Sequence, residues 1–210
     1  MRLVLASNNA KKLAELQALF AALPIELVTQ GSLGIAEAEE PHHTFVENAL
    51  VKARHAASLA NGAAIADDSG LCVDALGGAP GVISAHYAAI EPRDGEAREQ
   101  RRARQDAANN RLLLEHLAGA IDRRAHFISV LVAVRAAGDP EPLIAVGRWP
   151  GEILHAPRGD GGFGYDPLMF ITGLGCAAAE LLPDVKNEHS HRARSAQQML
   201  ALLREVWHLG

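Results

Sequence analysis

The sequence predicts an α/β protein with a mixed sheet, and three observations lead to this fold class. Residues 2–6 form a short apolar strand, followed by a polar turn and a helix whose leucines recur at helical spacing. A second helix and a further apolar strand follow at residues 44–66, which continues the alternation typical of α/β units. The apolar stretches 125–136 and 143–148 flank a Gly-Asp-Pro turn and predict a long hairpin, so antiparallel pairing is expected beside parallel pairing.

Composition limits the classes of function. The 210 residues are 49% hydrophobic, enough to bury a core, and we expect a single domain over residues 1–210. The formal net charge of −5 argues against a nucleic acid or an anionic membrane as partner. Cys72 and Cys176 form no zinc spacing and no disulfide framework, which fits a reducing compartment. No apolar run is long enough for a signal segment or a membrane span, so a cytoplasmic protein is expected.

The first strand–helix junction is a candidate anion site. The strand ends at Ser7-Asn8-Asn9, and the following helix carries Lys11 and Lys12 in its first turn. Backbone N–H groups at a helix start favour anions, whereas lysines there oppose the helix dipole. The sequence alone leaves two interpretations open, a bound phosphate or two solvated lysines.

An acidic loop follows the second strand, which we place at residues 25–29. Glu37, Glu39 and Glu40 lie close together in sequence and repel one another. Solvation of the loop relieves this repulsion, and so does a divalent cation such as Mg²⁺, which binds carboxylates together with waters and phosphates.

Thr44 and Glu47 form a capping-box pattern that predicts a helix running to about Asn61, with Gly62 as its C-terminal cap. Asn48 and Lys52 lie one turn apart on a polar face of this helix. Either side chain can reach a cleft or only solvent, and we favour the cleft for Asn48.

The strand at residues 63–66 is expected to deliver Asp67 and Asp68 into a turn with Ser69 and Gly70. Side chains alternate between faces along a strand, so the two acids are expected to point in opposite directions. One acid would then do chemistry while the other supports the turn. An ordinary Asp-Ser-Gly turn without a catalytic role is the alternative.

Residues 94–117 are rich in Arg and Glu and predict a long or broken helix ending at Gly119. Its acids and its lack of aromatic residues favour an exposed, salt-bridged face over nucleic-acid binding.

A glycine-rich segment at residues 158–167 is a candidate base-binding turn. A flat base can stack on Phe163 or Tyr165 and donate hydrogen bonds to Asp166. A tight hairpin with an apolar plug is the alternative. After Lys186, Ser190 is expected to cap a C-terminal amphipathic helix, and His191 and Arg192 would then lie at a helix start, where anions bind.

Taken in order, these motifs resemble the non-canonical purine nucleoside triphosphate pyrophosphatases, the inosine triphosphate pyrophosphatase family, over essentially the full chain. The matching segments are Ala6-Ser7-Asn8-Asn9 with Lys12, Ala38-Glu39-Glu40, residues 44–49, Ala66-Asp67-Asp68-Ser69-Gly70-Leu71, Gly78-Ala79-Pro80-Gly81, residues 161–167, and Lys186 with Ser190-His191-Arg192.

The resemblance implies an elongated α/β fold with a mixed sheet flanked by helices, two lobes around an active-site cleft, and a homodimer. It also implies Mg²⁺-dependent cleavage of inosine, deoxyinosine and xanthosine triphosphates (ITP, dITP and XTP) to the monophosphate and pyrophosphate. By this resemblance Asp68 is the general base, and Asp68 and Glu39 are metal ligands. The residues implied to bind substrate are Ser7, Asn8, Asn9, Ala10, Lys11, Lys12, Ser69, Lys186 and Arg192 for phosphate or sugar, and Phe163, Gly164, Tyr165, Asp166 and His191 for the base.

Base selection follows from hydrogen-bond chemistry. A 6-keto purine presents an acceptor where adenine presents an amine, so a donor such as His191 or a backbone N–H favours hypoxanthine and xanthine. Asn8 departs from the family pattern, in which Gly is common at this position. The question for the structure is whether the backbone here adopts a conformation that only Gly tolerates without strain.

Two alternatives remain. Related pyrophosphatases act on pyrimidine or modified nucleotides, and the segments at residues 163–166 and 190–192 disfavour that assignment. A catalytically silent nucleotide sensor could lose its metal-binding acids, whereas this chain retains Glu39, Asp67 and Asp68. A dinucleotide-binding Rossmann protein is excluded because no G-x-G-x-x-G follows the first strand.

Overall fold

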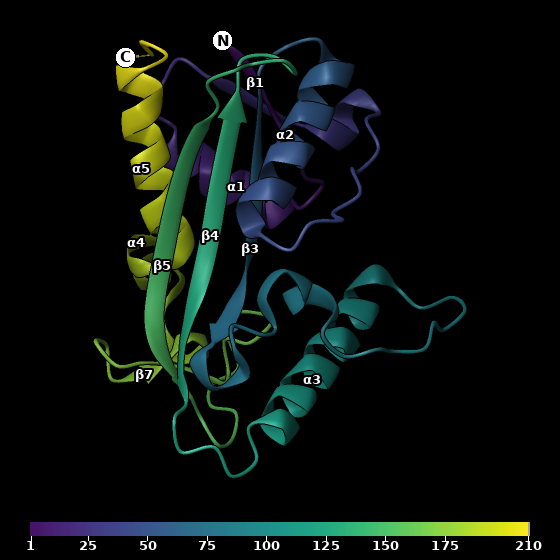
Figure 1. Cartoon of the computed structure of the whole chain (residues 1–210), viewed down its shortest axis with the longest axis vertical. Helices are drawn as coiled ribbons and strands as arrows, with labels where there is room; N and C mark the ends of the chain where they lie inside the picture. The colour runs from purple at the N-terminus through teal and green to yellow at the C-terminus, as the bar shows by residue number, and fades with distance from the viewer. Residues whose placement is uncertain (210) are drawn as a thin grey trace. The chain divides into compact units, whose positions relative to one another are not determined.

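The structure is a computed structural model that describes residues 1–209, apart from the side chains of Ala10, Lys11 and Glu15. Figure 1 shows its helices and strands along the chain. The strands are β1 (Arg2–Leu5), β2 (Glu26–Thr29), β3 (Ala64–Val73), β4 (Arg124–Val134), β5 (Leu143–Ile153), β6 (Met169–Ile171) and β7 (Cys176–Ala177). The α-helices are α1 (Ala10–Leu19), α2 (Phe45–Ala60), α3 (Arg98–His116), α4 (Pro183–His189) and α5 (His191–Glu205).

Within the described residues these strands form one sheet in the order β2-β1-β3-β4-β5-β6-β7. Strand β1 pairs in parallel with both β2 and β3, whereas β6 pairs antiparallel with β5 and β7. The prediction of a mixed sheet flanked by helices is therefore confirmed. Between residues 1 and 209 there is no helix with the length and apolar character that crossing a bilayer requires.

The chain divides into two compact units. The first contains Met1–Ser69, Ser129–Arg148 and the C-terminal segment from Asn187, and the second contains Gly70–Ile128 and Trp149–Lys186. Strands β3, β4 and β5 each contribute residues to both units.

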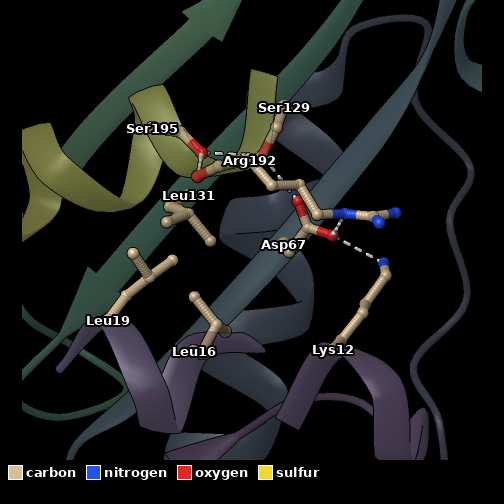
Figure 2. A pocket seen from close by; sticks show the side chains of 8 residues that line it. All are labelled: Lys12, Leu16, Leu19, Asp67, Ser129, Leu131, Arg192 and Ser195. Carbon is tan, nitrogen blue, oxygen red and sulfur yellow. Dashed lines mark hydrogen bonds and ion pairs between the residues drawn. The ribbon is translucent and has the colours of Figure 1, made fainter. Parts of the chain in front are cut away.

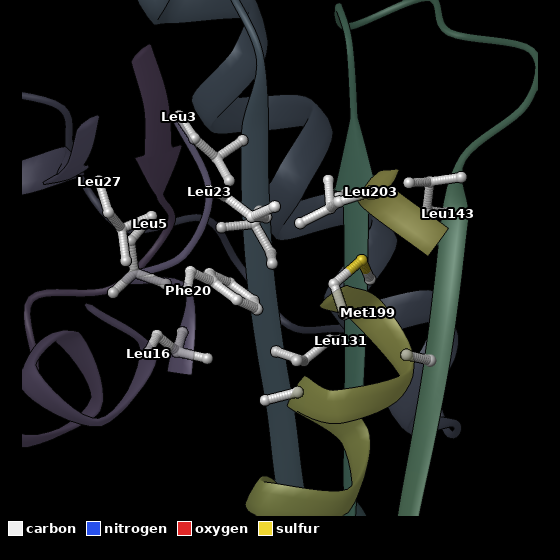
Figure 3. Packing of buried hydrophobic residues seen from close by; sticks show 14 residues of the cluster. Leu3, Leu5, Leu16, Phe20, Leu23, Leu27, Leu131, Leu143, Met199 and Leu203 are labelled. Carbon is white, nitrogen blue, oxygen red and sulfur yellow. The ribbon is translucent and has the colours of Figure 1, made fainter. Parts of the chain in front are cut away.

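The core of the first unit lies between the sheet and the helices α1 and α5 (Figure 3). Leucines at alternate positions of β1 face this core together with Ile65 of β3, because strand side chains alternate between faces. Helix α2 packs against β1 with a stripe of buried alanines, whose small side chains allow close approach. The main residues of this core are Leu3, Leu5, Leu16, Phe20, Leu23, Ile65, Leu131, Met199 and Leu203.

The second unit has its own apolar core, in which Trp149 is almost fully buried and packs beside Phe127. Helix α3 contributes Leu113 to this cluster, and Leu117, which caps its C-terminal end, joins it there, as the apolar end of the predicted helix suggested. The helix begins at Arg98, later than the predicted start at Asp94.

The end of α2 corrects one prediction. Thr44 caps its start as expected, since its hydroxyl accepts from the Glu47 N–H at 3.3 Å. The residue in the left-handed conformation at the other end is Asn61, with φ 48°, and not Gly62. Asparagine tolerates this conformation, and the Asn61 N–H bonds to the Ala57 carbonyl.

The acidic motif corrects another prediction. Asp67 and Asp68 do not enter a turn, because β3 continues from Ala64 through both acids to Val73. Turn-forming residue types were overridden by tertiary pairing, since each acid finds a cationic partner on its own side of the strand. Strand β5 likewise extends to Ile153, beyond the predicted end at Arg148.

Candidate active site

The side chains of Asp67 and Asp68 on strand β3 lie on opposite faces of the sheet, as the sequence predicted. Asp67 shares the face of Ile65 and meets Lys12 of α1 and Arg192 of α5. Asp68 lies on the other face and meets Lys52 of α2. The period of two along a strand thus separates two adjacent carboxylates into different environments.

Asp67 is buried, with 4% of its surface exposed, and anchors two cations (Figure 2). Its Oδ2 lies 2.6 Å from Lys12 Nζ and 3.9 Å from Arg192 Nε. On the other side, Ser129 Oγ donates to Oδ1 at 2.9 Å and lies 2.9 Å from Ser195 Oγ. Burial opposes ionisation, but Lys12 and Arg192 outweigh it and hold the pKa of Asp67 well below its usual range. This acid therefore stays anionic and orients the cations beside it.

A small pocket opens between α1, α5 and the sheet next to Asp67. One end carries the charged groups of Lys12, Asp67 and Arg192, and the other end is apolar. The lining residues are Lys12, Leu16, Leu19, Asp67, Ser129, Leu131, Arg192 and Ser195.

Asp68 has the features of a general base. It is 7% exposed, and its Oδ1 accepts a hydrogen bond from Lys52 Nζ at 3.0 Å. Its Oδ2 is buried and has no hydrogen-bond partner in the part of the chain that the structure describes. Burial raises the pKa of Asp68 to about 6 against the pull of Lys52, and the neighbouring Glu40 and Asp67 carboxylates add to the rise. A carboxylate with this pKa is ionised at neutral pH and still accepts a proton readily.

The raised pKa predicts that Asp68→Asn stabilises the fold at high pH. Between an unfolded pKa of 3.8 and a folded pKa of about 6, the folded chain binds more protons at Asp68, so its stability falls as pH rises through that window. Asparagine does not ionise, and we expect a gain in unfolding free energy of about 1 to 3 kcal/mol at pH 8 that has largely vanished at pH 4. Urea denaturation at both pH values measures it, with Asp74→Asn at an exposed acid as control. An equal effect of Asp68→Asn at the two pH values would contradict the assignment.

The polar turn before α1 is held by its own side chains. Ser7 Oγ accepts from the Asn9 N–H at 3.2 Å, and Asn9 Oδ1 accepts from the Lys12 N–H at 3.4 Å. Asn8 donates to Glu37 at 3.1 Å and is not among the described non-glycine residues with positive φ, so no glycine is required there. Two further predicted binding residues, Ala10 and Lys11, have side chains outside the described part of the chain.

The acidic loop brings Glu40, rather than Glu39, to the partly buried Lys52. Lys52 Nζ lies 2.9 Å from Glu40 Oε2 and 3.0 Å from Asp68 Oδ1, so it bridges two carboxylates. Although burial disfavours its charge, Asp68 and Glu40 raise the pKa of Lys52. Glu39 is exposed.

The carboxylates around Lys52 of α2, Asp68 and Glu40, partly meet the ligand requirements of a hard cation such as Mg²⁺. Carboxylate oxygens are the ligands that Mg²⁺ prefers. Asp68 Oδ2 is a buried acceptor with no hydrogen-bond partner among the described residues, and Glu40 supplies a second carboxylate nearby through Lys52. No cluster of three or more His, Cys, Asp or Glu side chains suited to a metal occurs among the described residues, so waters and substrate oxygens would complete the coordination.

In the second unit, the glycine-rich turn carries two aromatic rings, of which Phe163 is partly exposed and Tyr165 is buried. Tyr165 is 5% exposed, and its hydroxyl donates to the Ser84 carbonyl at 2.9 Å, which leaves Phe163 as the accessible ring. Asp166 accepts from the Phe163 N–H at 2.8 Å and pairs closely with Lys186. Lys186 Nζ also lies 4.9 Å from the Phe163 ring centroid, so this lysine lies beside the candidate base-binding turn.

The start of α5 agrees with the sequence. Ser190 caps the helix by accepting from the Ala193 N–H at 3.3 Å, and His191 is buried in the first turn. Arg192 Nη2 lies 3.5 Å from Ser69 Oγ, and Ser69 Oγ lies 3.4 Å from Asp67 Oδ2. Three of the predicted binding residues, Lys12, Ser69 and Arg192, thus lie around Asp67.

The sequence leaves open whether Asn48 or Lys52 reaches a cleft and favours Asn48, but it is Lys52 that contacts Asp68, whereas Asn48 forms two hydrogen bonds with the backbone of His42 and holds the loop there. Sequence reasoning missed two contributors, because Ser129 donates to Asp67 and Ser195 contacts Ser129. The hydroxyl of Ser129 within an otherwise apolar strand was the available signal for a buried polar contact.

Comparisons with known proteins identify the family of the chain and agree with its fold. The sequence model of the Ham1 family matches residues 3–202. A dITP/XTP pyrophosphatase of Methylibium petroleiphilum is 71% identical over 207 residues, which cover 99% of each chain, and one of Leptothrix cholodnii is 66% identical over the whole of both chains. Among solved structures, a HAM1 protein from Coxiella burnetii matches with a TM-score of 0.88 and 42% identity, covering 98% of this chain and 100% of that one.

Proposed function

The chain belongs to the Ham1 family, and from that premise we propose that it hydrolyses non-canonical purine nucleoside triphosphates such as dITP, ITP and XTP to the monophosphate and pyrophosphate. The observation that carries this proposal is the buried Asp68, whose Oδ2 has no hydrogen-bond partner in the described residues. The activity after which the relatives are named and this acid point to the same chemistry, attack of water on a phosphorus atom.

Asp68 acts as the general base. Its Oδ2 accepts the proton of the attacking water, while Lys52 holds Oδ1 and so fixes the direction of the free oxygen. A pKa of about 6 keeps the carboxylate ionised at neutral pH without making it too weak a base. The proton is then released to solvent after turnover.

Lys12 and Arg192 supply positive charge for the phosphates of the substrate. The chain as a whole is acidic, so binding of a polyanion depends on such local cations. Asp67 holds both of them in place through its Oδ2. The Ser7-to-Lys12 turn adds backbone N–H groups at the start of α1, which favour an anion.

We assign the metal role to Mg²⁺. Asp68 and an acid of the loop at Glu39 and Glu40 would hold it, and Glu40 has the stronger support because Lys52 already brings it toward Asp68. When bound, the ion neutralises charge on the phosphates and on the leaving pyrophosphate.

Base recognition is assigned to the turn at residues 163–166, with His191 as a further donor. The accessible Phe163 ring suits stacking, and a donor at this turn would favour a keto oxygen over an amine. Each buried donor left unpaired against adenine costs about 1 to 3 kcal/mol, or roughly one to two decades of discrimination. The homodimer that the resemblance implies and the cytoplasmic location expected from the apolar pattern of the sequence remain predictions.

The test is a panel of nucleotides with the purified protein and Mg²⁺. We expect pyrophosphate release from ITP, dITP and XTP at a kcat/KM at least about tenfold above that for ATP, whose base lacks the 6-keto group. We also expect faster release from these substrates than from GTP, and loss of activity with EDTA. Release of orthophosphate alone would refute pyrophosphatase chemistry. Equal rates on ATP and ITP would refute the substrate class, and binding of ITP without turnover would favour a silent sensor.

A further inference from the structure

Helix α3 forms hydrogen bonds with the two successive peptide groups of the base-binding turn that flank Gly164. Asp106 accepts a hydrogen bond from the Gly164 N–H at 2.9 Å, and Asn110 Nδ2 donates to the Gly164 carbonyl at 2.9 Å. One turn earlier in α3, the guanidinium carbon of Arg102 lies 5.1 Å from the Phe163 ring centroid. These three residues follow at intervals of four, so they lie on one face of the helix. The turn is thus held by a single row of side chains.

The contact with Asn110 fixes the direction of the peptide group that joins Gly164 to Tyr165. In a trans peptide the N–H points away from the C=O, and the one cis peptide within residues 1–209 is Ala79-Pro80. Because the Gly164 carbonyl faces α3, the Tyr165 N–H points away from that helix.

The Tyr165 N–H is also the donor that the turn leaves for a ligand. The N–H groups of Phe163 and Gly164 are taken by the carboxylates of Asp166 and Asp106, and the Asp166 N–H bonds to the Phe163 carbonyl at 3.2 Å. The Tyr165 N–H has no protein partner in the described residues. A keto oxygen can accept from it, whereas an amino group at the same ring position would meet it donor to donor.

We propose that Asp106 and Asn110 are positioning residues for base selection, which aim the Tyr165 N–H at the keto oxygen of the purine. This rests on the proposed function, because it takes the turn as the place where the base binds. Asn110 Oδ1 is buried without a hydrogen-bond partner in the described chain, so its amide is oriented by the Gly164 carbonyl alone. A reversed amide would set two acceptors against each other.

The first test is Asn110→Asp, which keeps the size of the side chain and removes its donor. The carboxylate repels the Gly164 carbonyl, and the peptide group carrying the Tyr165 N–H loses its fixed direction. We expect the ratio of kcat/KM for ITP to kcat/KM for ATP to fall about tenfold. The change should reside in KM for ITP, with kcat for ITP within about threefold of the parent, because Asn110 touches neither Asp68 nor Lys12.

Two variants of Asp106 test the contact with the Gly164 N–H, which belongs to the peptide group between Phe163 and Gly164. They also test the proposal if Asn110→Asp fails to fold. Asp106→Asn retains an acceptor for the Gly164 N–H and should keep the ITP-to-ATP ratio. Asp106→Leu frees that N–H as a second, misplaced donor and should lower the ratio by about tenfold. Arg111→Ala on the same helix, with its side chain 74% exposed, is the control and should leave the ratio unchanged.

The outcomes separate this inference from the proposed function. A parent protein inert on ITP, dITP and XTP overturns the proposed function and the inference with it. An active parent whose ITP-to-ATP ratio is unchanged in both Asn110→Asp and Asp106→Leu overturns the inference alone. Equal losses on ITP and ATP also overturn it, because they indicate only a structural role for the α3 contacts.

Discussion

Asp68→Asn is expected to lower kcat for ITP by roughly 10³-fold, because general bases contribute about 10² to 10⁴ to rate and the amide cannot accept the proton of water. The amide keeps the shape of the side chain and can still accept from Lys52 through its oxygen. Nucleotide binding through Lys12 and Arg192 should therefore persist, since Asp67 holds these cations on the opposite face of β3.

Two measurements decide this prediction. Steady-state release of pyrophosphate gives kcat, and calorimetry with ITP gives the dissociation constant, which should remain within about tenfold of the parent value because the phosphate cations are untouched. Asp74→Asn, at an acid that is exposed in the second unit, is the matched control and should retain full turnover. Turnover by Asp68→Asn within a few-fold of the parent would remove Asp68 as the base.

Gly147→Ala is expected to destabilise the first unit by about 3 kcal/mol, the upper end of the usual cost of overpacking, because neither neighbour can move aside. Gly147 lies in β5, where an added Cβ would overlap the His191 carbonyl and lie 2.6 Å from the Ser195 nitrogen. Both neighbours are backbone of the first turns of α5. The strand and the helix must separate, which would also displace Arg192 from Asp67 and Ser195 from Ser129.

Urea denaturation measures the effect of Gly147→Ala, and Gly138→Ala serves as the control. Gly138 lies in the same unit, and an added Cβ there has no neighbour within 4 Å among the described residues, so its stability should change by less than about 1 kcal/mol. A similarly small loss in Gly147→Ala would show that β5 and α5 adjust without strain.

Prediction from the sequence succeeded where local rules govern. The cap at Thr44, the cap at Ser190 and the mixed pairing of strands each follow from residue type or periodicity. It failed at the motif Asp67 to Gly70, where turn-forming residues lie inside a strand. Backbone preference at such positions amounts to about 1 kcal/mol or less, so ladder pairing and buried ion pairs override it.

The candidate active-site residues also show which features follow from local rules and which depend on tertiary contacts. Asn48 and Lys52 are one helical turn apart, and nothing in their spacing reveals which of them reaches the acids. The structure has Asn48 bonded to the His42 backbone and Lys52 between Glu40 and Asp68. This choice depends on how α2 lies against β3 and the acidic loop, which are packing contacts between distant segments.

The sequence by itself determined that two adjacent acids face opposite ways, because a strand alternates its side chains with a period of two. The ordered motifs also determined the family, since they are spread over nearly the whole chain. Only the tertiary structure decided the environment of each acid. Lys12 and Arg192 hold Asp67 as an anion, whereas burial beside Lys52 raises the pKa of Asp68 and leaves its Oδ2 without a hydrogen-bond partner among the described residues. Such differences arise from charges brought together by folding.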